Sequence, residues 1–170
     1  ENEKRAFELS QVSKISKEKP NLLPYKHLVT LAQSKTNLNE IIEALERTGE
    51  VKDIDENKLE DRVKCIKKWI QDHAPESVIF EVQKEKPEIE FDDLQNKCIK
   101  LLTEKMKEVE WSPEGIHNSF YELQEQNEIP AKNFFKIMYN VLLNKERGPR
   151  LGFFLATMNK KFIIERLESY

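Results

Sequence analysis

The sequence has little glycine and cysteine and no long hydrophobic run. Only 4 of its 170 residues are glycine, whereas 38% are hydrophobic and 35% are charged, a composition that fits a helix-rich protein. No apolar stretch approaches the roughly 18 residues that a membrane-spanning helix needs, so we expect no membrane partner. The charged N-terminus lacks the pattern of a signal peptide. The sequence therefore predicts a soluble, cytoplasmic protein.

The scarcity of cysteine also limits metal chemistry. Cys65 and Cys98 stand alone, with no C-x-x-C pair and no neighbouring pair of histidines, so no zinc site is predicted. Both lie on apolar faces of predicted helices, and we expect buried free thiols in a reducing cytosol. His27 and His73 have no carboxylate or cysteine at metal-ligand spacing, and neither is assigned to a metal.

The net charge of −3 conceals an asymmetry along the chain. Residues 131–170 hold 8 Lys and Arg against 3 Asp and Glu, a net charge of +5, which leaves −8 for residues 1–130. A polyanion such as RNA would be steered toward the basic C-terminal end. The acidic total argues against tight non-specific binding, and we expect no DNA partner.

Proline, glycine and apolar spacing divide the chain into segments of helical length. Apolar residues spaced three and four apart predict a helix from Asp55 to about His73, and Ser112 followed by Pro113 is typical of another helix start. Residues 78–82 are rich in β-branched side chains and predict either a short strand or an extended linker. The pattern as a whole predicts an all-α fold of two helical subdomains, residues 22–82 and 91–170, joined by a connector at residues 83–90.

A basic turn near the C-terminus is the most informative segment. Pro149 is predicted to be the first residue of a new helix and Gly148 its cap, so that backbone N–H groups and the helix dipole would face an anion. Lys145, Arg147 and Arg150 add three cationic groups within six residues, which suits phosphate or a nucleic-acid backbone. The alternative is a solvated basic turn between two helices.

Five blocks of the sequence, in order, resemble the C-terminal part of class I lysyl-tRNA synthetases. The most specific reads Asn-Lys-Glu-Arg-Gly-Pro-Arg-Leu-Gly-Phe-Phe-Leu at residues 144–155 and continues at residues 159–167. The others are Ala-Phe-Glu-Leu-Ser at residues 6–10, Leu-Pro-Tyr-Lys-His-Leu-Val at residues 23–29, Trp69 and Ile70 leading to Ala-Pro-Glu-Ser-Val-Ile-Phe-Glu at residues 74–81, and Trp111 with residues 116–118. The H-x-G-H and K-M-S-K-S motifs that bind ATP in that family do not occur here.

This resemblance implies a helical cage that grips the anticodon loop of lysine tRNA between two subdomains. Residues 1–21 would then be a linker from a catalytic domain that is missing from this chain. The fragment is expected to be a catalytically silent monomer without a cofactor, whereas its parent would use ATP with magnesium to join lysine to tRNA. Two alternatives stay open at this point: the C-terminal domain of a glutamyl- or glutaminyl-tRNA synthetase, and a helical protein-interaction module without a tRNA contact.

Six residues are candidates for the tRNA contact. Lys145, Arg147 and Arg150 are predicted to meet phosphates or base edges, because an arginine fork can pair with a base or lie flat on it. Phe153 is either a stacking platform or a core residue, and Trp69 either edges a groove or packs between subdomains. Asn118 either donates to a base or belongs to the helix surface.

Overall fold

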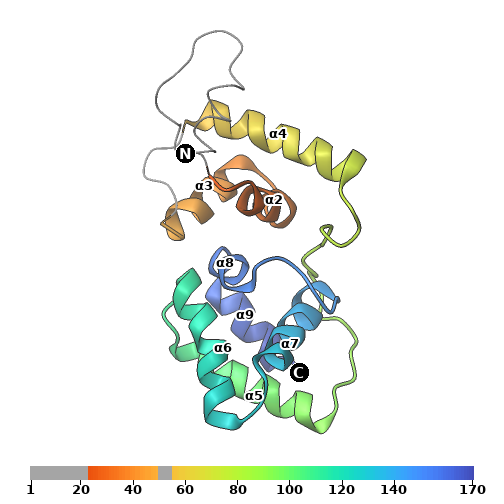
Figure 1. Cartoon of the computed structure of the whole chain (residues 1–170), viewed down its shortest axis with the longest axis vertical. Helices are drawn as coiled ribbons and strands as arrows, with labels where there is room; N and C mark the ends of the chain where they lie inside the picture. The colour runs from red at the N-terminus through yellow and green to blue at the C-terminus, as the bar shows by residue number, and fades with distance from the viewer. Residues whose placement is uncertain (1–22, 50–54) are drawn as a thin grey trace, which may run out of the picture.

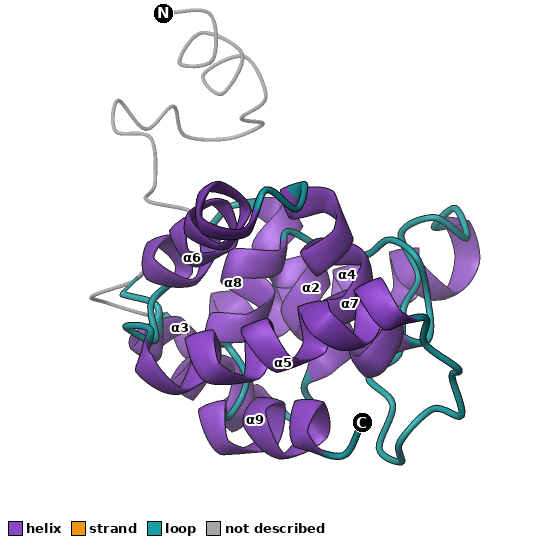
Figure 2. Ribbon diagram, turned by 90° about the horizontal axis from the view of Figure 1, so that it is seen from below, coloured by secondary structure: helices purple, strands orange, loops and turns teal. Residues whose placement is uncertain are grey.

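The computed structural model describes residues 23–49 and 55–170, and within these ranges it contains eight α-helices and no strand (Figures 1 and 2). The helices are α2 (Tyr25–Ser34), α3 (Leu38–Arg47), α4 (Glu56–His73), α5 (Asp93–Glu108), α6 (Pro113–Asn127), α7 (Ala131–Leu143), α8 (Leu151–Ala156) and α9 (Lys160–Glu168). This confirms the predicted all-α class. The predicted linker at residues 1–21 lies outside the described residues.

The helices form two groups, as Figure 1 shows, and each group surrounds an apolar core of its own. In the first group α2 packs on α4, and in the second α5 packs on α9 and α6 on α8. The first core contains Leu28, Leu31, Ile41, Leu45, Leu59, Val63 and Ile66, and the larger second core contains Leu102, Met106, Ile116, Phe120, Phe134, Ile137 and Phe154. The boundaries predicted for the two subdomains and their connector stay predictions.

Short polar side chains fix where the helices begin. Asp55, Asp92, Ser112 and Asn159 each accept a hydrogen bond from a backbone N–H of the first helical turn that follows. Pro113 is the first residue of α6, where its missing N–H costs no helical hydrogen bond. The helix starts that the sequence predicts near Asp55 and at Ser112 are therefore confirmed.

The start of α8 differs from the prediction. Pro149 does not open this helix, which begins at Leu151 with Arg150 as the preceding cap residue. The reason lies in α7, where the Tyr139 hydroxyl donates a hydrogen bond of 2.7 Å to the carbonyl of Pro149 and holds the turn in a non-helical path. With only six residues, α8 has few aligned peptide dipoles, so side chains carry the positive charge of this region.

The short helix α8 connects the two groups of helices. Phe153 packs into the first core, whereas Phe154 and Leu155 pack into the second. Gly152 allows a close approach between α8 and α6, because a Cβ atom there would lie 2.4 Å from the carbonyl oxygen of Pro113. The sequence of α8 thus sets the distance between the two halves of the molecule.

Two cations of the first group hold the C-terminal end of α8. Lys35 Nζ donates to the carbonyl of Thr157 at 2.6 Å, and Arg47 donates to that of Met158 at 3.5 Å. Burial, with Arg47 close by, lowers the pKa of Lys35. These bonds satisfy carbonyls that a helix end leaves without an intrahelical partner.

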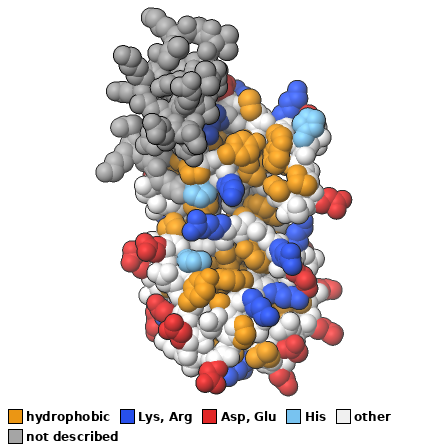
Figure 3. Space-filling model, in the orientation of Figure 1, with side chains coloured by type: hydrophobic (Ala, Val, Ile, Leu, Met, Phe, Trp, Pro, Cys, Tyr) orange, Lys and Arg blue, Asp and Glu red, His pale blue; other side chains and the backbone are white. Residues whose placement is uncertain are grey.

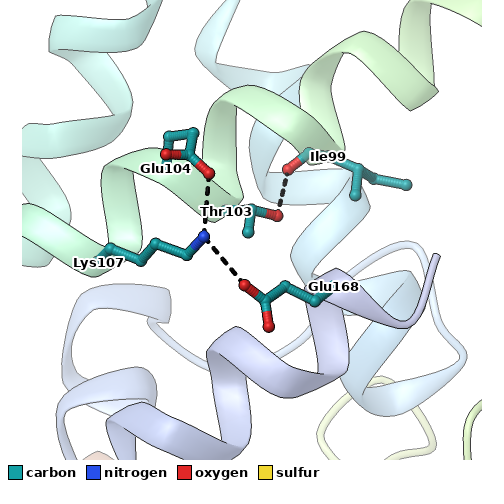
Figure 4. A network of polar contacts seen from close by, with 5 residues as sticks. All are labelled: Ile99, Thr103, Glu104, Lys107 and Glu168. Carbon is teal, nitrogen blue, oxygen red and sulfur yellow. Dashed lines mark hydrogen bonds and ion pairs between the residues drawn. The ribbon is translucent and has the colours of Figure 1, made fainter.

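The C-terminal helix α9 is tied to α5 by a small polar network (Figure 4). Lys107 Nζ lies 3.0 Å from a carboxylate oxygen of Glu104 and 2.9 Å from one of Glu168, so it bridges the two helices. These two carboxylates raise the pKa of Lys107. Beside them, the Thr103 hydroxyl donates to the carbonyl of Ile99 within α5. The network links the C-terminal parts of α5 and α9.

Arg166 of α9 is a buried cation that organises the segment between the two groups. Only 6% of its surface is exposed, and its guanidinium donates to the carbonyls of Val141, Gln83 and Lys84 at 2.8–2.9 Å. It also lies over the ring of Phe162. Because these hydrogen bonds come from a charged donor, we expect them to stabilise the fold more than neutral ones.

Residues 78–82 form neither a helix nor a strand, which favours the extended linker over the strand. The Gln33 side chain holds this segment, since it donates to the carbonyl of Val78 and accepts from the backbone N–H of Phe80. Of the two cysteines, Cys98 is buried as predicted, but Cys65 is exposed, because it lies on the outer face of α4. The prediction of two buried thiols is therefore wrong for Cys65.

Candidate nucleic-acid interface

The basic turn between α7 and α8 is held firmly on both sides. Asn144 ends α7 in the left-handed conformation, with φ at 51°, and Lys145 Nζ donates to the carbonyl of Ile79 at 2.6 Å. Glu146 forms an ion pair with Lys136 of α7, which lowers the pKa of Glu146. The charges at positions 145 and 146 thus have partners within the molecule.

Arg147 and Arg150 are exposed, and within the described residues neither belongs to an ion pair. The turn that carries them packs closely on α7, because a Cβ atom on Gly148 would lie 2.7 Å from Leu143 and 2.9 Å from Tyr139. The backbone beneath the two guanidinium groups is therefore fixed, while the groups themselves face solvent. Such cations are available to phosphates or base edges.

Two adjacent pockets meet at this turn and share two residues, His27 and Arg150. The first, which we name the α6 pocket, has a volume of about 340 Å³ and is lined by His27, Pro113, Glu114, His117, Asn118, Arg150 and Phe153. The second, the α4 pocket, has a volume of about 520 Å³, and Tyr25, Lys26, Trp69, Gly148, Pro149 and Arg150 contribute to its lining. Arg150 therefore stands between two hollows at the junction of the helix groups.

Aromatic rings lie at both pockets. Tyr25 is 49% exposed and meets Trp69 edge-to-face at a centroid distance of 6.0 Å in the α4 pocket. Near the α6 pocket, His117 meets Tyr121 at 5.2 Å, and Tyr121 is 43% exposed. Exposed rings beside cations are what unpaired bases use for stacking.

The charged side chains on this face are also unevenly distributed. Figure 3 shows Lys, Arg and His side chains gathered with hydrophobic ones across the middle of the face, whereas Asp and Glu lie toward its edges. A negatively charged strand would thus be drawn toward the junction and away from the rim.

The structure brings most of the predicted site residues together. Arg150, Phe153 and Asn118 line the α6 pocket, and Trp69 lines the α4 pocket with Arg150. Lys145 lies at the edge of the same turn and lines a further hollow with Ile79. Their roles in binding stay predictions.

Phe153 is the candidate most engaged in packing. It is only 3% exposed, and its ring stacks on His27 with a centroid distance of 4.0 Å and an angle of 13°. This stack fixes the shared wall of the two pockets. Of the two roles that the sequence allowed for Phe153, a stacking platform or a core residue, its packing in this structure is that of a core residue.

Sequence reasoning missed Tyr25, Glu114 and Tyr121 as members of the site. A signal for Tyr25 was present, because Tyr25, Lys26 and His27 place two aromatic rings around a cation directly after a helix-breaking proline. Glu114 and Tyr121 gave no such signal. They look like ordinary surface residues of α6 until the fold places the basic turn beside that helix.

The described residues form an all-helical fold, and at the junction of its two groups of helices the exposed Arg150 lies between two pockets with aromatic rings, an arrangement suited to unpaired nucleic acid. Residues 68–170 match the family model described as "Anticodon binding domain", which covers more than half of the sequence. The chain belongs to the anticodon-binding domain family.

Individual relatives extend this similarity to almost the whole chain. A lysine–tRNA ligase of Picrophilus torridus is 31% identical over 166 residues, which are 98% of this chain and 32% of that protein. Lysine–tRNA ligases of Thermococcus kodakarensis and Borrelia garinii are each 34% identical, over 96% and 97% of this chain. The chain spans about a third of the length of these curated relatives.

Two negative findings apply to residues 23–49 and 55–170. Within these ranges no cluster of three or more His, Cys, Asp or Glu side chains has a geometry that could hold a metal ion. In the same part of the chain, none of the helices combines the length and the apolar character required to cross a membrane.

Proposed function

We propose that this chain is the anticodon-binding part of a lysine–tRNA ligase and that it binds the anticodon loop of lysine tRNA at the two pockets beside the basic turn. The single observation that carries the site is the position of Arg150, which lines both pockets at once. The similarity to lysine–tRNA ligases over nearly the whole chain supports the choice of tRNA. It also favours lysine over the glutamate and glutamine alternatives.

The parent enzyme would join lysine to its tRNA with ATP and magnesium, and this chain would contribute tRNA binding only. The H-x-G-H and K-M-S-K-S motifs that the chemistry would need do not occur in the sequence. We propose that the protein acts in the cytoplasm as a monomer. The anticodon loop would lie between its two helical subdomains, residues 22–82 and 91–170. Residues 83–90 would connect the subdomains, and residues 1–21 would lead from the catalytic domain.

The binding mechanism divides the site into three kinds of contact. Arg147, Arg150 and Lys145 attract the phosphates of the loop. This attraction weakens as the salt concentration rises, because release of the counterions of the RNA into a more concentrated salt solution gains less free energy. Tyr25 and Trp69 at one pocket and Tyr121 beside the other give faces on which splayed bases stack. Donors and acceptors in the α6 pocket then meet the edge of a base.

A filter-binding titration of the chain tests this proposal. The ligands are lysine tRNA, the same tRNA with an altered anticodon, and glutamate tRNA, each at several salt concentrations. We expect salt-sensitive binding that is strongest for lysine tRNA and is reduced when its anticodon changes. Equal binding of all three RNAs, or binding that salt does not affect, would contradict the proposal and favour a protein-interaction module.

A further inference from the structure

The α6 pocket combines one strictly accepting group with several donors. Glu114 presents a carboxylate, which only accepts hydrogen bonds, and Arg150 presents a guanidinium, which only donates. Asn118 can do both through its amide. Glu114 and Asn118 are four residues apart on α6 and therefore lie on one face of that helix, opposite the turn that carries Arg150.

The backbones that carry these groups are fixed relative to each other. The start of α6 is set by the Ser112 hydroxyl, which accepts from the N–H of Gly115 at 3.0 Å. Gly152, two residues after Arg150, lies so close to α6 that an added Cβ atom would be 2.4 Å from the carbonyl oxygen of Pro113, the residue before Glu114. Within the described residues no ion pair engages either Glu114 or Arg150. An acceptor and a donor thus line one hollow without neutralising each other.

The size and polarity of the hollow suit a single small base. At about 340 Å³ it lies near the lower limit of small-molecule pockets, which span roughly 300–1,000 Å³. Two donating side chains and one accepting carboxylate complement an edge with two acceptors and one donor. Uracil has that edge with the donor in the middle, because two carbonyl oxygens flank its ring N–H, and cytosine has it with the donor at one end. Guanine has two donors, and adenine lacks the second acceptor, so the hollow suits a pyrimidine.

We infer that the α6 pocket reads one uracil of the anticodon, with Glu114 accepting the hydrogen bond of the uracil ring N–H and Arg150 donating to a neighbouring carbonyl oxygen. This inference rests on the proposed function. The choice of uracil over cytosine follows from the lysine codons AAA and AAG, whose paired anticodons contain uracil at two or three positions. Glu114 is then a residue that determines specificity, although it belongs to the acidic part of the sequence.

A chemical change in the RNA tests the inference directly. The ligand is a hairpin with the anticodon stem and loop of lysine tRNA, in which each anticodon uridine is replaced in turn by 3-methyluridine, whose ring N–H is gone. Binding is measured by fluorescence anisotropy for the wild-type chain and for Glu114→Ala. The matched control is Glu125→Ala, an exposed glutamate eleven residues later on the same helix, about 16 Å along its axis.

At one anticodon position we expect methylation to weaken wild-type binding about tenfold, because the carboxylate then faces a methyl group and loses its partner. The same methylation should change binding by Glu114→Ala less than twofold, whereas Glu125→Ala should behave as the wild type. Methylation thus costs the wild type more affinity than it costs Glu114→Ala, and the difference measures the contact between Glu114 and the base.

Two results separate the inference from the proposed function. If the wild-type chain binds the unmodified hairpin in an anticodon-dependent way, but methylation has no effect or weakens Glu114→Ala as much as the wild type, the inference is wrong and the proposed function stands. If the wild-type chain does not distinguish anticodons at all, the proposed function fails and the inference fails with it.

Discussion

The two ends of α8 use cations in opposite ways. At its C-terminal end, Lys35 and Arg47 donate to the backbone carbonyls of Thr157 and Met158, so these cations tie the two groups of helices together. Before its N-terminal end, Arg147 and Arg150 are exposed and have no ion-pair partner among the described residues, and Arg150 lines a pocket with Tyr25 and Trp69. Charges that stabilise the fold and charges that are available to a ligand therefore lie at opposite ends of one six-residue helix.

This comparison separates stability from binding, because each set of cations should affect one of them and leave the other nearly unchanged. Arg166 belongs with Lys35 and Arg47, since it has three carbonyl partners and little exposed surface. The positively charged C-terminal region that the sequence shows is thus not one binding surface. Only some of the cations in this region are available to a ligand.

Loss of Arg166 should have the largest effect on stability. In Arg166→Ala, three carbonyls lose a charged donor, and we expect the free energy of unfolding to fall by about 3 kcal/mol. Chemical denaturation followed by circular dichroism measures this change. Lys161→Ala is the control, since Lys161 is exposed on the same helix, and a loss as large there would show that Arg166 has no special role.

Substitution of Gly152 should disturb both stability and binding. A methyl group there would lie 2.4 Å from the carbonyl of Pro113, so α8 must move away from α6, which typically costs about 1–3 kcal/mol of stability. Because this contact also sets Arg150 against Glu114, we expect Gly152→Ala to weaken tRNA binding as well. Denaturation and filter binding of the same protein measure the two effects.

Gly49 provides the contrast to Gly152. Its φ is +69°, and a Cβ atom there would meet nothing within 4 Å, so Gly49→Ala should cost only the strain of a left-handed residue, about 1 kcal/mol. We expect tRNA binding by Gly49→Ala to equal that of the wild type. A similar loss of binding in both variants would mean that instability alone, and not the geometry at α6, explains the effect of Gly152→Ala.

Loss of the exposed arginines, Arg147 and Arg150, should weaken binding and leave stability unchanged. Arg150→Ala and Arg147→Ala should each weaken binding of lysine tRNA by about 1–3 kcal/mol if they read a base edge, with an unchanged melting temperature. If an arginine contacts phosphates only, its loss should instead reduce the slope of log K against log salt concentration by about one. Wild-type binding by both variants would show that the site lies elsewhere.

The sequence predicted the helices well because their signals are local. Apolar spacing from Asp55 to His73 and the pair Ser112 and Pro113 depend on neighbours within one or two turns, and these helices appear as predicted. The start of α8 was misplaced, because Tyr139, ten residues earlier, holds Pro149 in the turn. Such a contact depends on packing between elements and leaves no periodic pattern in the sequence.

The candidate site was predictable only in part for the same reason. Arg147 and Arg150 were visible as a cluster in one segment, but the residues that line the two pockets with Arg150 include members of α2, α4 and α6. Glu114 would have been read as a helix-start carboxylate, which suits the helix dipole wherever it occurs. Its place in the pocket follows from the approach of α8 to α6 at Gly152, and no single segment encodes that approach.

The ion pair between Lys136 and Glu146 should have the smallest effect and is best examined by pH. Lys136 lowers the pKa of Glu146 below its ordinary value of 4.5, so the folded state favours the charged carboxylate. The stabilisation is therefore present above pH 4.5 and is lost as the pH falls through the lower pKa of the folded state. Since both side chains are exposed, the pair adds little to overall stability.

An NMR titration of the Glu146 carboxyl group measures this coupling directly. In the wild type we expect its midpoint below 4.5, and in Lys136→Ala a midpoint that moves up toward 4.5, with a remaining decrease due to Arg147. Lys132→Ala, one turn earlier on α7, is the matched control and should leave the midpoint unchanged. If Lys136→Ala leaves it unchanged too, the pair does not hold the turn in solution. The exposed position of Arg147 and Arg150 would then depend on Tyr139 and Gly148 alone.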